Sequence, residues 1–168
     1  LERYRRRLEL RWLPAAAAGA LLLALVLPAS VLAATPSERA ERYLLRAQNS
    51  DGGFGAAPRQ ASSPLYSGWT GLGLAASGSN ARDVARRGGR SLAGYLRSGV
   101  RGLRDIGEIE RTVLVLRSAG LDPHDVAGRN LIGEIQAKRR ADGSIAGFVS
   151  YTAFGILALR SAGEPAGG

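Results

Sequence analysis

Gln48-Asn49-Ser50-Asp51-Gly52-Gly53-Phe54-Gly55 decides the fold, because a related stretch returns later in the chain. The segment 136–145 reads Q-A-K-R-R-A-D-G-S-I, with a glutamine at the end of a helical pattern and then an Asp-Gly turn. The turn residues of interest are Gln48, Asp51, Gly52, Gly53 and Phe54 in the first stretch and Asp142 and Gly143 in the second. Recurrence of such a segment indicates repeats of one supersecondary unit.

Three apolar stretches give the period of the repeat. They read G-L-G-L-A-A-S-G over 71–78, T-V-L-V-L-R-S-A-G over 112–120 and G-I-L-A-L-R-S-A-G over 155–163. The closing glycines Gly78, Gly120 and Gly163 are 42 and 43 residues apart. A fixed period of this size indicates a repeat architecture, in which one supersecondary unit stacks on the next, and it predicts about three repeats in this chain.

The residue pattern predicts an all-α fold. Ser37 can cap a first helix that runs to Gln48, and Asp51-Gly52-Gly53 breaks it. Apolar residues at helical spacing then predict helices over 65–77, 81–96 (interrupted at Gly88-Gly89), 108–119, 124–138 and 148–162. No segment alternates apolar and polar residues as a strand does. We therefore expect helical hairpins that fill one repeat domain over residues 34–168.

The first 33 residues have the pattern of an export signal. Five arginines precede residue 12, and 13–32 is free of charge and rich in Ala and Leu. Small residues at Val31 and Ala33 fit cleavage before Ala34. The same apolar run is long enough to span a bilayer, so an uncleaved anchor is the alternative. Either way the repeats lie outside the cytoplasm, secreted or attached to the outer face of the cytoplasmic membrane, with this segment as the only membrane contact.

Composition excludes several functions. The 168-residue chain has no cysteine, so disulfides and thiolate chemistry are absent. Its net charge of +9 comes almost entirely from arginines that are interleaved with acids, which argues against a nucleic-acid partner. Contact between these arginines and an anionic cell-envelope surface is a further possibility. The chain starts at Leu1 and ends just after a repeat, so we expect it to be part of a longer reading frame.

The turn and the apolar stretches resemble those of the squalene–hopene cyclase and protein prenyltransferase repeat superfamily. The resemblance rests on the Asp-Gly-Gly-aromatic segment 48–55 and on the T-A-x-x-x-L-A-L-R-S-A-G segment 152–163, and it extends over most of 37–163. It implies an α/α toroid, in which inner helices line a central cavity and outer helices surround them. Three hairpins amount to about half of such a ring. The same scaffold serves enzymes and ligand-binding proteins, so it does not fix the activity.

The resemblance also implies which residues line the cavity. Counting back from the closing glycines, the residue before the inner-helix Thr position is Tyr66, Glu108 or Tyr151, and one turn on come Trp69, Arg111 and Phe154. Such a wall suits a bulky apolar ligand, and its aromatic faces can stabilise a cation. The alternative is that these aromatics pack one helix against another.

Glu108 is the candidate acid. In 105–108, which reads D-I-G-E, Gly107 stands where the cyclases of this resemblance carry a proton-donating aspartate. Glu108 can act as an acid if it is buried, and the alternative is an ion pair with Arg111 or Arg104. The zinc site of the prenyltransferases needs a cysteine that this chain lacks, and His124 follows Asp122-Pro123, where a capping or surface role is expected.

The function expected from the sequence is therefore an exported, non-catalytic ligand-binding or structural module with terpenoid-cyclase-like repeats. Its partner would be an apolar or isoprenoid-like small molecule, and it needs no cofactor and no metal. The alternative is an isoprenoid-processing enzyme, either a terpene cyclase or a prenyltransferase, whose catalytic residues lie outside this stretch of sequence.

Overall fold

The computed structural model describes residues 34–165, and the expected signal or anchor segment 1–33 lies outside the described residues. The helices are α2 (Pro36–Ala47), α3 (Pro64–Ala76), α4 (Leu92–Gly99), α5 (Ile106–Ser118), α6 (Leu131–Gln136) and α7 (Val149–Ser161), with a 3-10 turn η3 (Val100–Gly102) after α4. Within 34–165 there is no β-strand, only isolated bridges. The expected all-α class is confirmed.

Four of these helices begin at a side-chain cap. In each case an oxygen of the residue before the helix accepts a hydrogen bond from a backbone N–H three residues further on, which satisfies a donor that the helix itself leaves unpaired. The capping residues are Ser63, Ser91, Asp105 and Asn130. Helix starts in this chain are therefore set by local chemistry.

The helices α3, α5 and α7 end in the same way. Gly78, Gly120 and Gly163 each follow one of them with a positive φ of 93°, 69° and 85°. In all three, the next residue's N–H donates to the carbonyl oxygen five residues earlier over 2.9 Å. This is a Schellman motif, which needs a left-handed residue that glycine adopts without strain. The period read from the closing glycines therefore corresponds to a structural repeat of these three helices.

The two Asp-Gly turns also have one geometry. Asn49 N–H donates to the carbonyl of Gly53 over 3.0 Å, and Arg140 N–H donates to that of Ser144 over 2.8 Å. Asp51 and Asp142 each accept a hydrogen bond over 2.9 Å from the N–H two residues on. This superposition places Arg139, and not Gln136, at the position of Gln48. Gln136 ends α6 and the Asp-Gly turn follows it, as expected, but three more residues separate Gln136 from the turn than separate Gln48 from the first turn.

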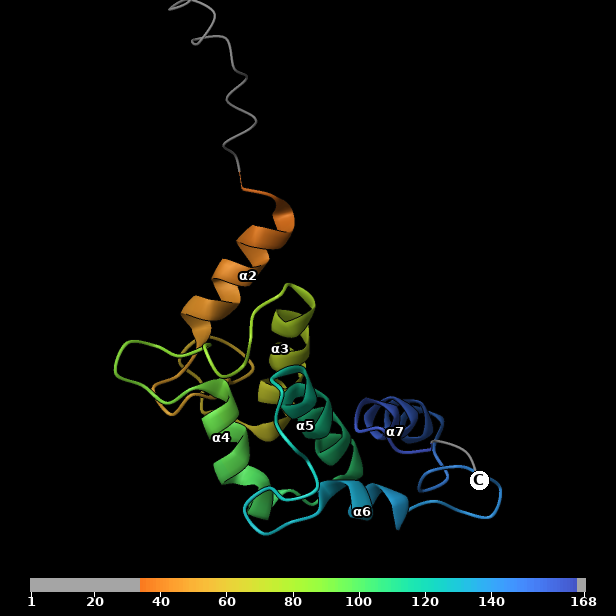
Figure 1. Cartoon of the computed structure of the whole chain (residues 1–168). Helices are drawn as coiled ribbons and strands as arrows, with labels where there is room; N and C mark the ends of the chain where they lie inside the picture. Colours follow the sequence, from red (N-terminus) through yellow and green to blue (C-terminus); the bar gives the residue numbers. More distant parts are fainter. Residues whose placement is uncertain (1–33, 166–168) are drawn as a thin grey trace, which may run out of the picture. The chain divides into compact units, whose positions relative to one another are not determined.

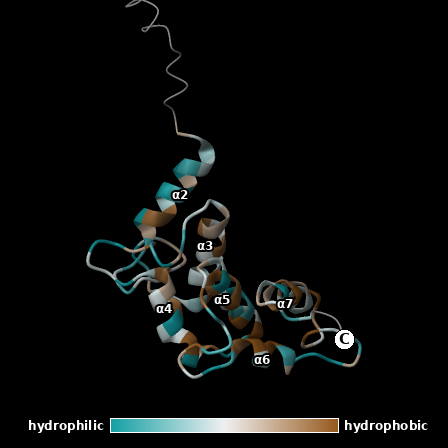
Figure 2. Ribbon diagram, viewed as in Figure 1, coloured by the Kyte–Doolittle hydropathy of each residue, from teal (hydrophilic) through white to brown (hydrophobic). Residues whose placement is uncertain are grey.

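The helices pack in two layers, one of α3, α5 and α7 and one of α4 and α6. α5 lies between α3 and α7 and packs against both, as Figure 1 shows. α4 contacts both α3 and α5, and α6 contacts both α5 and α7, so each short helix covers a junction between two long ones. α2 contacts α3 and buries none of its residues. Its ribbon is largely hydrophilic in colour, whereas α7 is mostly hydrophobic (Figure 2).

The core follows the repeat. Leu74, Leu116 and Leu159, at equivalent positions of α3, α5 and α7, are all 1% exposed or less. They belong to one cluster of buried residues that also takes in the capped starts of α4 and α6 through Leu92 and Leu131. Burial of a leucine stabilises a fold by about 2 kcal/mol, so this row fixes the spacing between the layers. Across 34–165, no helix has both the length and the apolar character that a bilayer crossing requires.

Two of the expected helices are shorter than the sequence indicated. The first half of 81–96 is a loop in which Ala85 pairs with Ser91 across Gly88, whose φ is 73°, and only α4 is helical. In 124–138 the helix begins only at Leu131, because Ala127 and Gly128 take φ values of 52° and 81° and form a tight turn. In both places a local turn overrides an apolar periodicity.

Candidate functional site

The three long helices present equivalent side chains on one face. With the repeat offsets of 42 and 43, the positions form rows across α3, α5 and α7. The rows are Tyr66, Glu108 and Tyr151; Trp69, Arg111 and Phe154; and Leu72, Leu114 and Leu157. All six residues that the sequence assigned to a cavity wall lie in the first two rows. Tyr66, Trp69 and Leu157 are 41%, 47% and 55% exposed, so this face is open to solvent.

The second row is a stack of three side chains. The guanidinium carbon of Arg111 lies 5.1 Å from the centre of the Trp69 ring, which is a cation–π contact. The Trp69 and Phe154 rings are 5.5 Å apart and nearly perpendicular at 86°. Arg111 itself is only 8% exposed. Of the four aromatic residues expected in a cavity wall, Trp69 and Phe154 are in contact, and the protein's own arginine already lies over the Trp69 ring.

An acid–phenol pair borders this stack. The Tyr151 hydroxyl donates to Asp105 Oδ2 over 2.7 Å, and this bond raises the pKa of the phenol. The other oxygen, Asp105 Oδ1, accepts from the backbone N–H of Glu108 and lies 3.9 Å from Arg111 Nη2. Asp105 therefore links the start of α5 to α7 and to the arginine of the stack. Sequence reasoning pointed to this D-I-G-E segment but assigned no role to its first residue.

Glu108 is not placed as expected. Its side chain is half-buried at the start of α5. Neither of the arginines proposed as its partner forms an ion pair with it, because Arg111 lies against Asp105 and Arg104 donates to the carbonyl of Arg101. Gly107, at the place of the proton donor in the resemblance, is closely surrounded, with Tyr151 Cε1 3.0 Å from where a β-carbon would be. A side chain there does not fit without displacing Tyr151.

The buried acid of this region is Glu110, which the sequence reasoning missed. Glu110 is 0% exposed, and neither carboxyl oxygen has a hydrogen-bond partner in the structure. Burial raises the pKa of this carboxyl to about 8, Arg111 lowers it and Asp105 raises it further. Its Oε1 lies against Gly155 of α7, 3.1 Å from where a β-carbon would stand. The signal was available, because Glu110 falls on the same helical stripe as Ile106 and Val113.

The residues of the first turn build structure. Gln48 is 2% exposed, and its Nε2 donates to the carbonyls of Gly52 and Val84 over 3.0 and 2.9 Å. Phe54 is 2% exposed, and its N–H donates to Ser67 Oγ on α3. The equivalent bond runs from Ile145 N–H to Thr152 Oγ1 on α7, also over 2.9 Å. The Asp-Gly turns therefore hold α3 and α7 near their starts, and Gln48 faces backbone groups.

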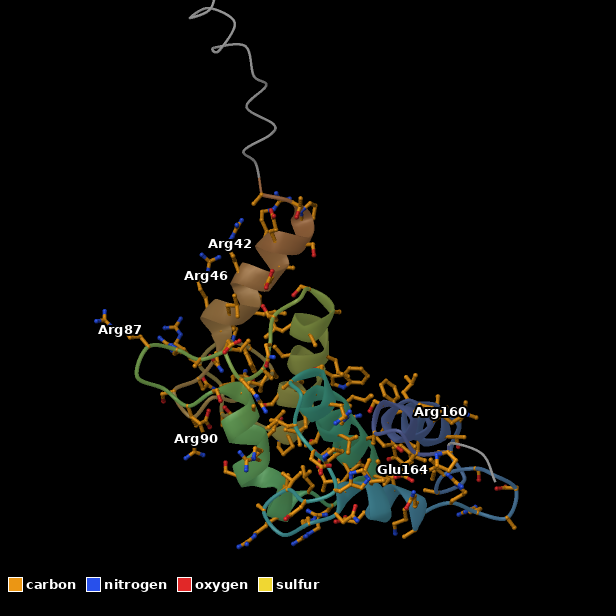
Figure 3. The ribbon with its side chains drawn as sticks, in the orientation of Figure 1. Arg42, Arg46, Arg87, Arg90, Arg160 and Glu164 are labelled. Atoms are coloured by element: carbon orange, nitrogen blue, oxygen red, sulfur yellow. The ribbon has the colours of Figure 1, made fainter. Side chains whose placement is uncertain are left out.

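His124 lies in the loop between α5 and α6 and joins two acids. Its Nδ1 is 2.7 Å from Asp122 Oδ1, and its Nε2 is 3.4 Å from Glu164 Oε1. The hydrogen bond to Asp122 raises the pKa of the imidazole. Glu164, which is labelled in Figure 3, also accepts a hydrogen bond from the side-chain amide of Gln136 at the end of α6. In residues 34–165 no group of three metal-ligating side chains is found.

Comparison with known proteins identifies no relative of this chain. No protein-family model, no curated protein and no solved structure matches the chain.

Proposed function

We propose that this chain is an exported binding module, with repeats of the squalene–hopene cyclase and protein prenyltransferase type, that holds a neutral apolar small molecule and does no chemistry of its own. The binding surface is the face formed by the three rows on α3, α5 and α7. The observation that carries the proposal is the stack of Trp69, Arg111 and Phe154, in which the Trp69 ring is 47% exposed to solvent.

The curvature of this face supports a ligand site. Trp69 and Phe154 belong to the first and third long helices, yet their rings meet across α5 at 5.5 Å. Neighbouring helices pack about 8–10 Å apart, so a flat layer would separate α3 from α7 by about twice that distance. A bend of the layer toward the aromatic row is part of this proposal, and the contact between the two rings supports it. Part of an α/α toroid requires a bend in this direction. We therefore include the toroid in this proposal.

The charge of Arg111 favours a neutral ligand over a carbocation. Two positive charges about 5 Å apart repel each other by about 3 kcal/mol at an effective dielectric constant of 20. Cation stabilisation on the aromatic rings would have to overcome this repulsion. The carboxyl that holds its proton is Glu110, and it is buried against α7 instead of facing the ligand surface. The alternative, an isoprenoid-processing enzyme, therefore needs catalytic residues from outside this stretch of sequence.

Ligand binding is expected to quench Trp69. In a Trp12→Phe background Trp69 is the single tryptophan, and farnesol serves as a neutral isoprenoid probe. Phe154→Ala should weaken the affinity severalfold, because it removes the ring that packs edge-on against Trp69. Tyr43→Ala, an exposed aromatic on α2, is the matched control and should leave the affinity unchanged. Equal losses in both variants would show that the quenching reports non-specific adsorption.

Export is expected to remove the first segment. Mass spectrometry of the protein recovered from outside the cytoplasm should find a mature terminus near Ala34, because 31–33 carries the small residues that signal cleavage requires. A membrane-bound form that retains residues 13–32 would indicate the anchor alternative. An intact Leu1 terminus on soluble protein inside the cell would contradict export.

A further inference from the structure

Exposed apolar side chains gather at the two ends of the helix stack. Among residues 34–165, nine large hydrophobic residues are substantially exposed, and all belong to the first hairpin or to α7 and the residue before it. They are Tyr43, Leu45, Leu65, Tyr66, Trp69, Phe148, Val149, Ile156 and Leu157. None lies on α4, α5 or α6. Repeat stacks whose ends are not capped by polar faces require a partner there.

The outer side of α7 is equivalent to the side of α3 that packs against α5. Gly68 and Gly71 of α3 pack against Arg111 and Val115 of α5, and one repeat on, Glu110 packs against Gly155 of α7. The residues equivalent to Gly68 and Gly71 on α7 are Ala153 and Ile156, which are both exposed. They line an open groove with Phe148, Val149 and Thr152. Within residues 34–165, no helix covers this side of α7 in the way that α5 covers α3.

The outer side of α3 is equivalent to the side of α5 that packs against α3. On α5 that side carries Arg111 and Val115, and the equivalent residues on α3 are Trp69 and Gly73. Trp69 is 47% exposed, and no atom lies within 4 Å of where a β-carbon on Gly73 would stand. One chain thus carries both halves of the contact that already joins its own long helices. The α7 half is open, and on the α3 half Gly73 is open while Trp69, which also packs against Arg111 and Phe154, is half-exposed.

Charge complementarity supports the same junction. Arg117 of α5 donates from Nε to the carbonyl of Ser161 at the end of α7 over 2.8 Å. Arg160 is its equivalent on α7; it is exposed, and within residues 34–165 its side chain has no hydrogen-bond or ion-pair partner. The residue equivalent to Ser161 on α3 is Ala76, the last residue of the helix, where the carbonyls carry partial negative charge. A second α3 beside α7 would offer Arg160 this acceptor.

We propose that the α7 end binds the α3 end of a second copy of this chain, head to tail. Ala153 and Ile156 would face Trp69 and Gly73 of that copy, and Arg160 would reach the end of its α3. The contact is heterologous, because different surfaces meet, so two copies close into a ring if the rotation allows and form an open stack otherwise. The row of Trp69, Arg111 and Phe154 would continue across the junction.

Cross-linking tests this in the full chain, which contains no cysteine. A short bismaleimide is added to a mixture of Ala153→Cys and Gly73→Cys chains, both at exposed positions. We expect a covalent dimer in the mixture and none with either variant alone. The double variant should give one dimer band for a closed ring or a ladder for an open stack. Dimer formed by Ala153→Cys alone, or none in the mixture, would overturn the proposal.

A second pair of variants tests the arginine. Arg160→Ala is added to the chain that carries Ala153→Cys, because that chain contributes α7 to the junction. This change should lower the association constant of the two chains about tenfold, measured from the concentration dependence of cross-linking. Arg87→Ala is the matched control, since Arg87 projects from the loop before α4, away from the helices (Figure 3). Equal association in the two variants would contradict a role for Arg160 at the junction.

Discussion

We expect Glu110→Gln to stabilise the protein by several kcal/mol above pH 8 and to change its stability little near pH 4. Glu110 is completely buried without a hydrogen-bond partner, so its charged form is strongly disfavoured in the folded protein. Glutamine has nearly the same shape and stays neutral at every pH. The variant therefore keeps the packing against Gly155 and removes the cost of ionisation.

The sign of the effect follows from where the proton is held. Burial raises the pKa of Glu110 from 4.5 to about 8, so the folded protein keeps a proton that the unfolded chain loses near pH 4.5. Each pH unit in this window lowers the free energy of unfolding by about 1.4 kcal/mol. The loss is absent below pH 4.5 and reaches about 5 kcal/mol above pH 8. Rising pH therefore destabilises the wild-type protein through this group.

Urea unfolding at a series of pH values measures the difference directly. The free energies of wild type and Glu110→Gln should diverge between pH 5 and pH 8, and other titrating groups cancel because both proteins share them. Parallel curves for wild type and Glu110→Gln would show that Glu110 is ionised in the folded protein.

Gly52→Ala should destabilise the protein by about 3 kcal/mol or more. Gly52 has a φ of 90°, and a β-carbon there would stand 2.5 Å from the carbonyl oxygen of Ser91 and 2.6 Å from that of Arg90. The positive φ costs about 1–2 kcal/mol for a residue with a β-carbon. The clash with two backbone oxygens adds overpacking of about 1–3 kcal/mol, because backbone cannot rotate away as a side chain can.

The repeat supplies a matched control for this change. Gly143 occupies the same place in the second Asp-Gly turn, with a φ of 81°, but nothing lies within 4 Å of its β-carbon position. Gly143→Ala should therefore cost only the conformational part, about 1–2 kcal/mol. Thermal unfolding of both variants separates strain from crowding. Equal losses would mean that the loop carrying Arg90 and Ser91 does not pack on the first turn in solution.

Local signals in the sequence located the long helices well. α3 and α5 begin directly after the capping residues Ser63 and Asp105, and a glycine lies two residues after the end of α3, α5 and α7. The ends of the three helices were therefore predictable to within two residues. The short helices α4 and α6 were not, because the apolar residues before them, such as Val84 and Val126, are buried by loops and not by helices. Periodicity alone cannot separate a buried loop residue from a helical one.

The candidate site was predictable in its members but not in its interactions. The repeat offsets brought Trp69, Arg111 and Phe154 into one row, and the structure brings their side chains together. That Arg111 would lie over Trp69 and beside Asp105 depends on tertiary packing between α3 and α5, which sequence spacing does not specify. Glu110 was not predicted, because the resemblance points to Glu108, although Glu110 is the acid on the apolar stripe of α5.

The most direct test of a neutral-ligand site is to compare farnesol with farnesylamine, which carries a positive charge at neutral pH. Both are titrated against Trp69 fluorescence in the Trp12→Phe background. Arg111 lies over the Trp69 ring, so we expect farnesol to bind at least tenfold more tightly than the amine. Arg111→Gln should narrow that preference. Tighter binding of farnesylamine would instead show a surface built to stabilise cations, and it would contradict a binding module without chemistry.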